Sequence, residues 1–159
     1  MRQPKVAPHL RISLRVLQLA QAMNFSKKAE YALRAIVAMS RSAPGTVFSI
    51  QSLSNDEGIP LKFLEQILLI LRKGGLLHSK RGAGGGYQLA RPASRITLGE
   101  VLELVDGPMD ILPGSKSASS GIHAIFAQLQ TDLRAWLASV SVADVLQRDQ
   151  AAGSGSFDI

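Results

Sequence analysis

The segment that decides the fold is SIQSLSNDEGIPLKFLEQILLILRKGG, residues 49–75. It holds two short helical patterns that are separated by Gly58 and Pro60. Ser49 can cap the first helix, and Pro60 can open the second helix in its first turn. Two helices joined by a tight turn are typical of a helix-turn-helix, in which the second helix enters the DNA major groove. A helical hairpin that only packs against its own domain has the same pattern, so the flanking sequence decides between them.

The second of these helices, residues 60–73, has an amphipathic pattern. Its predicted buried stripe consists of Phe63, Leu64, Ile67, Leu68 and Leu71. Its polar side carries Lys62, Glu65, Gln66, Arg72 and Lys73. We expect the apolar side to dock on the domain and the polar side to face DNA.

A β-hairpin is predicted directly after this helix. Two glycines end the helix, residues 76–81 read as a strand, and residues 86–91 alternate as its partner. The tip, residues 82–86, is almost entirely glycine and follows Lys80 and Arg81. It fits neither GxxxxGK[ST] nor a strand-to-helix GxGxxG, so a nucleotide-phosphate loop is disfavoured. We interpret the hairpin as a wing that approaches the sugar–phosphate backbone and the minor groove.

Two further helices complete the predicted domain. Ser26 can cap a helix that runs to about residue 41. Thr97 and Glu100 have the spacing of a capping box and open a helix through about residue 105, which Gly107 closes. We therefore predict a mainly α fold with a small β-hairpin wing, a winged helix-turn-helix over residues 23–107.

The sequence predicts a long C-terminal helix beyond a loop at residues 108–121 that is rich in serine and glycine. Apolar residues recur in this helix at alternating spacings of four and three, the a/d pattern of a coiled coil. They are Ile122, Phe126, Leu129, Leu133, Trp136 and Val140. We expect residues 122–146 to form a dimerisation helix and a short terminal helix, and residues 147–159 to be a disordered tail. Packing of the long helix on its own domain is the alternative.

Charge is divided unevenly along the chain. Residues 1–22 carry four basic and no acidic residues, residues 23–95 carry eleven basic and four acidic, and residues 96–159 carry three basic and eight acidic. The first two thirds therefore predict a surface for a polyanion, and the last third a different role. An ordinary solvated basic surface is the alternative.

The first 22 residues read as an N-terminal extension that is either disordered or the result of a misassigned start, with Met23 as the start of the fold. Arg11 and Arg15 interrupt the apolar stretch that a signal peptide needs. An acid-free segment with arginines is also found in mitochondrial transit peptides, which stays an open alternative.

Composition excludes several classes of protein. The chain contains no cysteine, so it cannot form disulfides, thiolate zinc sites or cysteine-ligated iron–sulfur clusters. Its longest apolar stretches, such as residues 67–71, are far below the roughly 20 residues of a membrane span. The three histidines lie in separate segments, and no catalytic triad or carboxylate pair is apparent. We predict a soluble, cytoplasmic protein that is not an enzyme and has no membrane partner, metal or cofactor.

Five blocks in this order resemble the Rrf-type winged-helix regulators, the family of IscR, NsrR and CymR. They are YALRA at residues 31–35, IPLKFLEQ at 59–66, LRKGGL at 71–76, RGAGGGYQLAR at 81–91, and ITLGEV with VDG at 96–107. The resemblance covers roughly residues 23–146. One block alone would be weak evidence for the family, whereas five blocks in order at the right spacing are highly specific evidence.

The resemblance implies a bacterial homodimeric transcription factor, usually a repressor, whose long helix crosses to the partner subunit. Because two-fold DNA-binding dimers usually match palindromic half-sites, we expect it to bind a palindromic operator in double-stranded DNA. The candidate DNA contacts are Lys28, Tyr31, Lys62, Phe63, Glu65, Gln66, Arg72, Lys80, Arg81, Gly82 and Gly84. By resemblance, Lys28 and Tyr31 would sit at the phosphates, and Arg81 with Gly82 in the minor groove.

Three candidates at the start of the second helix would contact bases by the same resemblance. Glu65 can accept a hydrogen bond from a cytosine amino group, and Lys62 can reach guanine or phosphate. Phe63 can contact a thymine methyl group. The predicted buried stripe also claims Phe63, so a core position and a DNA contact both stay open for it.

The chain departs from the family in two places. Glu30 stands where many relatives keep a base, which puts a phosphate contact there in doubt. In the loop around residues 108–123, sensing members carry three cysteines that hold an iron–sulfur cluster, whereas Ser120 stands here at the last of those positions. His123 matches a histidine of some relatives, and we interpret it as a polar residue at a helix start. The effector is then an unknown small molecule or protein, and a winged-helix protein-interaction module is the alternative function.

Overall fold

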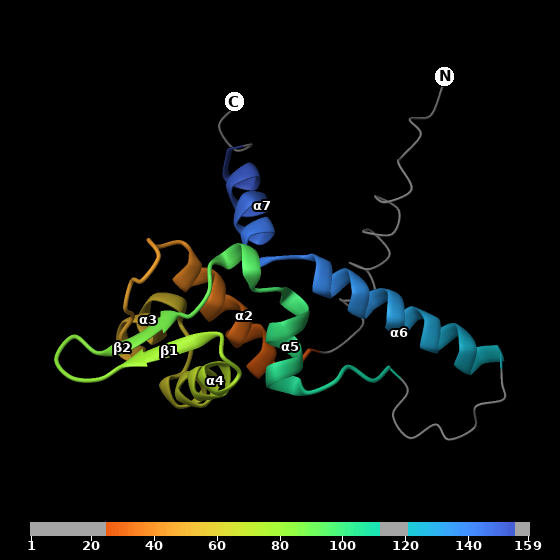
Figure 1. The fold of residues 1–159 in the computed structure, drawn as a ribbon, viewed down its shortest axis with the longest axis horizontal. Coiled ribbons are helices and arrows are strands. Elements are labelled where there is room, and N and C mark those ends of the chain that lie inside the picture. Colours follow the sequence, from red (N-terminus) through yellow and green to blue (C-terminus); the bar gives the residue numbers. More distant parts are fainter. Residues whose placement is uncertain (1–24, 112–120, 155–159) are drawn as a thin grey trace.

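The computed structural model describes residues 25–111 and 121–154, and the chain is mainly α-helical with a two-stranded antiparallel hairpin (Figure 1). The predicted N-terminal extension and most of the predicted loop at residues 108–121 lie outside the described residues. In chain order the elements are α2 (Lys27–Ser40), α3 (Ile50–Glu57), α4 (Leu61–Lys73), β1 (Leu77–Lys80), β2 (Gly86–Leu89), the short 3₁₀ turn η1 (Ala93–Arg95), α5 (Leu98–Asp106), α6 (Gly121–Ser139) and α7 (Val142–Ser154). None of the helices in residues 25–111 and 121–154 combines the length and the hydropathy of a membrane span. The predicted fold class is confirmed.

The helices begin and end at the residues that capping rules predict. The Ser26 hydroxyl accepts from the Ala29 amide at the start of α2, and the Ser49 hydroxyl accepts from the Ser52 amide at the start of α3. Gly58 ends α3 in the left-handed conformation, with φ of 61°. Pro60 is the cap of α4 rather than its first helical residue, which differs from the prediction by one position.

The core forms around α2, which lies in the middle of the winged-helix domain (Figure 1). Small residues of α2, including the fully buried Ala32 and Ala35, let the neighbouring helices approach closely. The buried side of α4 consists of Leu64, Ile67, Leu68 and Leu71. Each fully buried leucine side chain stabilises the fold by roughly 1.5–3 kcal/mol. Docking of this side fixes the polar side of α4 outward.

A glycine pair directs the chain from α4 into the wing. The Leu76 amide donates to the Leu71 carbonyl at 2.9 Å, and the Gly75 amide donates to the Arg72 carbonyl at 3.0 Å. With Gly75 at φ of 77°, these bonds form a Schellman motif. Gly74 packs against Leu104 of α5, where a Cβ would be 2.5 Å from the leucine methyl groups. The orientation of the hairpin relative to α4 is therefore set by backbone geometry.

The hairpin pairs residues 77–80 with residues 86–89 in antiparallel register, from Leu77 opposite Leu89 to Lys80 opposite Gly86. Phe48, from the segment before α3, forms a further antiparallel bridge to Tyr87, with two backbone hydrogen bonds of 2.8 Å. This bridge attaches the wing to the start of the helix-turn-helix.

The long helix α6 divides its apolar residues between its own domain and the outside. Leu133 and Leu137 are buried against Ala29 and Leu102, whereas Ile122 and Ile125 are 64% and 70% exposed. Figure 1 shows α6 projecting away from the winged-helix domain on the side opposite the wing. Of the predicted seam, Leu133 and Val140 are buried, Phe126, Leu129 and Trp136 are half-buried, and Ile122 is exposed. Val140 lies just beyond the end of α6.

The terminal helix α7 is longer than the sequence analysis expected. It runs to Ser154, whereas a disordered tail was expected from residue 147. Residues 147–152 contain no glycine or proline, and Asp149 forms a 3.2 Å ion pair with Arg41 at the end of α2. Favourable helix propensity and this tertiary contact extend the helix.

Candidate nucleic-acid interface

The first turns of α4 present four candidate DNA contacts on one exposed surface. They are Lys62, Phe63, Glu65 and Gln66. Phe63 is 48% exposed, so the prediction that it belongs to the buried stripe is wrong. Phe63 precedes Leu64 by one residue and so lies 100° from it around the helix, at the edge of the apolar side. The exposed ring is available for an apolar contact.

The Phe63 ring is held from the side by an aromatic ring of α2. The ring centroids of Tyr31 and Phe63 are 6.3 Å apart, and their planes meet at 66° in an edge-to-face arrangement. Such pairs contribute about 0.5–1.5 kcal/mol beyond the area that they bury. Two predicted site residues from different helices are therefore brought together.

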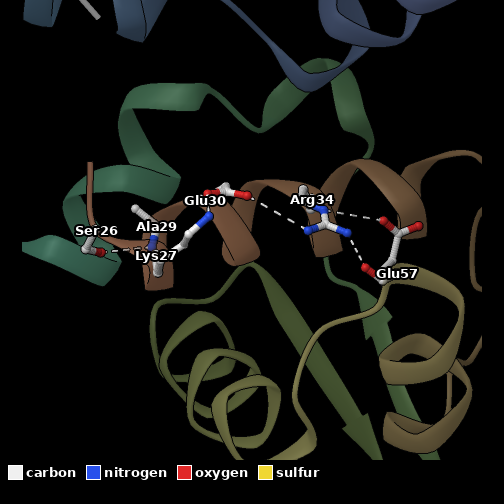
Figure 2. Close-up of polar contacts among 6 residues, drawn as sticks. All are labelled: Ser26, Lys27, Ala29, Glu30, Arg34 and Glu57. Atoms are coloured by element: carbon white, nitrogen blue, oxygen red, sulfur yellow. Dashed lines mark hydrogen bonds and ion pairs between the residues drawn. The ribbon is translucent and has the colours of Figure 1, made fainter. Parts of the chain in front are cut away.

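Two cations flank the Tyr31 ring. The Lys27 ammonium lies 6.0 Å and the Arg34 guanidinium 5.8 Å from its centroid. Both also pair with Glu30, at 2.7 Å for Lys27 and 3.9 Å for Arg34 (Figure 2). The hydrogen bond to Glu30 raises the pKa of Lys27, and the same bond lowers the pKa of the Glu30 carboxyl. Glu30 therefore offsets part of the basic charge on this end of α2, beside the half-buried Lys28.

Arg34 extends from α2 to the end of α3, and the sequence analysis missed it. Its Nη2 donates to the Glu57 carbonyl, and its Nε lies 3.9 Å from the Glu57 carboxylate (Figure 2). Its position three residues after Tyr31 and four after Glu30 was the available signal, because residues at these spacings share a helix surface. The partner on α3 could not be inferred from that spacing.

The wing tip presents the remaining candidates to solvent. Lys80, Arg81, Gly82 and Gly84 are all exposed, and within the part of the chain that the structure describes neither basic residue forms an ion pair. Gly82 and Gly84 have φ of 94° and 70°, a region that favours glycine. The tip therefore carries two unpaired cations on a backbone with few side-chain obstacles.

Arg72 has a contact within the domain. Its Nη1 donates to the Ser79 hydroxyl of β1 at 3.3 Å, so it joins the last turn of α4 to the wing. Its side chain is exposed, which leaves the rest of the guanidinium accessible. Arg72 can therefore support the wing and face a phosphate.

A pocket of about 640 Å³ lies between α5, α6 and the segment that follows α5. Its apolar walls include Leu102, Leu137 and Met109. Its charged members are Glu100, Glu103, Asp106 and Arg134. Nη2 of Arg134 donates to the Met109 carbonyl at 2.7 Å, while its Nε is buried without a hydrogen-bond partner among the described residues. Buried unpaired donors are unfavourable, so the Arg134 side chain is an incompletely satisfied group beside this pocket.

The described residues contain no group of three or more histidine, aspartate or glutamate side chains that could hold a metal ion. His123 lies in the first turn of α6. The sequence has no cysteine. The donor set therefore does not fit a cysteine-ligated cluster.

Comparisons with known proteins agree with the resemblance in the sequence. A family model named Rrf2, described as an iron-dependent transcriptional regulator, matches residues 25–148. A Mycobacterium tuberculosis protein, Rv1287, named provisionally as an HTH-type transcriptional regulator, is 40% identical over 77% of this chain and 81% of its own. The HTH-type transcriptional regulator IscR of Cereibacter sphaeroides is 36% identical over 72% of this chain and 74% of its own. The solved structure of T. potens IscR matches with a TM-score of 0.70 and 27% identity, over 84% of this chain and 93% of that one.

Proposed function

Because the chain belongs to the Rrf2 family of DNA-binding transcriptional regulators, we propose that it is a homodimeric repressor that binds a palindromic operator. The observation that carries this proposal is the orientation of α4. Its leucine side is buried, and its first turns expose Lys62, Glu65 and Phe63 together. A helix held in this way can enter the major groove with its N-terminal residues over base edges.

Each group at the start of α4 has a chemical counterpart on DNA. The Glu65 carboxylate accepts from a cytosine amino group, and the Lys62 ammonium donates to guanine or phosphate. The exposed Phe63 ring contacts a thymine methyl group. Gln66, one turn further, lies on the same exposed side and can donate to or accept from a base.

The wing and α2 supply contacts to the backbone in this proposal. Arg81 reaches into the minor groove, where a narrow A·T-rich segment attracts arginine, and Lys80 with the glycine tip approaches the phosphates. Lys28, Tyr31 and Arg72 lie where phosphates flank the recognition helix. Such contacts make affinity fall steeply with salt concentration.

The dimer forms through the N-terminal half of α6. This half exposes Ile122 and Ile125 beside the half-buried Phe126 and Leu129. An exposed apolar surface on a projecting helix is typical of a protein interface. Two-fold pairing of α6 would present two copies of α4 to the two halves of a palindrome.

Regulation proceeds without a cysteine-ligated cluster in this proposal, because the sequence offers no thiolate. The family description nevertheless includes iron dependence. We assign effector binding to the pocket beside Arg134, where a small molecule or a protein segment can contact both α5 and the C-terminal half of α6. A ligand at this position can couple the dimer helix to the DNA-binding domain. The site of action is the bacterial cytoplasm.

The test is fluorescence anisotropy of the 159-residue protein with DNA from upstream of its own gene, at several salt concentrations and with random DNA as competitor. We expect preference for one palindromic segment, and an affinity that falls steeply as salt rises. Equal, weak binding to both DNAs that persists after addition of cell extract would contradict a sequence-specific regulator.

A further inference from the structure

The Arg34 side chain joins α2 to the end of α3, the first helix of the helix-turn-helix. Its guanidinium contacts the Glu57 carbonyl and carboxylate at the end of α3 and the Glu30 carboxylate on its own helix (Figure 2). It also lies 5.8 Å from the centroid of the Tyr31 ring. Tyr31 in turn packs edge-to-face on Phe63 of α4. These contacts form a continuous path from Arg34 to a side chain that faces DNA.

We propose that Arg34 is a positioning residue for base recognition: it fixes the Phe63 ring over the major groove through Tyr31 and through the end of α3. The inference rests on the proposed function, in which Phe63 contacts a thymine methyl group. Arg34 itself need not touch DNA.

The end of α3 is the place where such a contact has most effect. The last carbonyl groups of a helix lack partners within the helix, and a cation there satisfies them. Only the turn from Gly58 to Pro60 separates Glu57 from α4. Inside that turn, the buried Ser54 hydroxyl donates to the Ile59 carbonyl at 2.6 Å. The turn is therefore fixed by two hydrogen bonds, one from Ser54 of α3 to the Ile59 carbonyl and one from Arg34 of α2 to the Glu57 carbonyl.

The chemistry requires arginine rather than any cation. A planar guanidinium has five donors and can bind a carbonyl and a carboxylate while it lies against an aromatic ring. A lysine ammonium is a single point of charge and cannot reach all three groups at once. The Arg34 side chain is 41% exposed, so solvent screens its ion pairs and their contribution to folding stability is small. Its removal should therefore affect recognition more than folding.

The experiment compares thymine with deoxyuridine, which lacks only the 5-methyl group. Thymines of the operator are replaced by deoxyuridine one at a time. For the wild-type protein and for Arg34→Lys, anisotropy then gives the ratio of the affinity for the thymine operator to the affinity for each deoxyuridine operator. Loss of one methyl contact should weaken wild-type binding about three- to fourfold at the thymine beneath Phe63. In Arg34→Lys the ratio at that thymine should fall toward one, while the melting temperature stays close to that of the wild type.

Two further variants make the result specific. Arg41→Lys is the matched control, because Arg41 follows the same helix, is exposed and pairs with Asp149 of α7 rather than with the turn. It should keep the wild-type ratio. Tyr31→Leu keeps Arg34 beside Glu57 but removes the ring between Arg34 and Phe63. Its thymine-to-deoxyuridine affinity ratio should therefore fall toward one, as in Arg34→Lys.

The outcomes separate the inference from the proposed function. If the wild type discriminates thymine from uracil and Arg34→Lys keeps the full ratio, the positioning role is wrong and the Phe63 contact stands. If the wild type shows no discrimination at any operator thymine, the Phe63 contact itself is wrong, and the positioning role is overturned with it.

Discussion

Gly86 in β2 lies against the backbone of Phe48, so closely that a Cβ at position 86 would be 2.1 Å from the Phe48 carbonyl oxygen. The backbone hydrogen bonds between Phe48 and Tyr87 hold the two segments at this distance. The wing is therefore attached to the start of the helix-turn-helix at a point where only glycine fits.

The first prediction concerns this contact. Gly86→Ala should lower the free energy of unfolding by about 1–3 kcal/mol, since the new methyl group displaces backbone rather than a flexible side chain. Operator affinity should fall as well, because the wing loses its attachment. Gly84→Ala is the control: its φ of 70° is unfavourable for alanine, but nothing lies within 4 Å of the added Cβ. Urea unfolding should show the larger loss for Gly86→Ala, and equal losses would contradict the steric account.

The second prediction concerns the wing tip. Arg81→Ala should weaken operator binding and reduce the preference for A·T-rich flanks. It should also lower the salt slope, the slope of log affinity against log salt concentration, by about one per protomer. The measurement is anisotropy at several salt concentrations with operators of different flanking sequence. Arg148→Ala removes an exposed arginine from α7, which lies across the domain from α4 (Figure 1), and should leave the slope unchanged. An unchanged slope for Arg81→Ala would remove Arg81 from the DNA surface.

The third prediction concerns the dimer helix. Ile125→Asp places a charge on the exposed apolar side of α6 and should convert the dimer to a monomer at micromolar concentration. Loss of the two-fold arrangement should also reduce operator affinity strongly. Ala127→Asp adds the same charge about 200° around the helix and should leave the dimer intact. Sedimentation equilibrium distinguishes these results, and a monomeric wild type would contradict the proposed assembly.

The fourth prediction concerns pH and the start of α7. Hydrogen bonds from the Ser141 hydroxyl and amide, at 2.7 and 2.8 Å, lower the pKa of the Asp144 carboxyl below its ordinary value of 3.8. Because the folded-state pKa is depressed, the charged carboxylate stabilises the fold above pH 3.8, and this contribution is lost as pH falls through the folded-state pKa.

Asp144→Asn should therefore be less stable than the wild type at pH 7, and the difference should shrink below about pH 4. Ser141→Ala, which removes the hydroxyl donor, should reduce the same pH-dependent difference. Urea unfolding at pH 7 and pH 3 provides the measurement. A difference between wild type and Asp144→Asn that is the same at both pH values would show that the charge of Asp144 does not stabilise the start of α7.

Local rules predicted most of the helix-turn-helix and the wing. The local signals are the serine caps, the glycine after α3 and the glycine pair after α4. Each of them forms its hydrogen bonds with residues only a few positions away, so the sequence alone locates them. The capping box at Thr97 shows the limit of such rules. Thr97 accepts from the Glu100 amide as predicted, but the Glu100 carboxylate pairs with Arg91.

Features that depend on distant segments were predicted less well. Phe63 lies at the edge of the apolar side of α4, where its ring packs edge-to-face on Tyr31 of α2 and remains 48% exposed. The a/d pattern of α6 did not reveal that Leu133 and Leu137 pack on their own domain while Ile125 is exposed. Arg34 was missed because its partner, Glu57, is separated from it by 23 residues.

The central claim is that the start of α4 reads bases, and Glu65→Ala tests it most directly. Affinities of the wild type and of Glu65→Ala are measured for a set of operators in which every half-site position carries each of the four base pairs. We predict that the variant loses discrimination at one position per half-site, by roughly 1–3 kcal/mol, and keeps the wild-type preference elsewhere. A variant that ranks all operators as the wild type does would contradict the account.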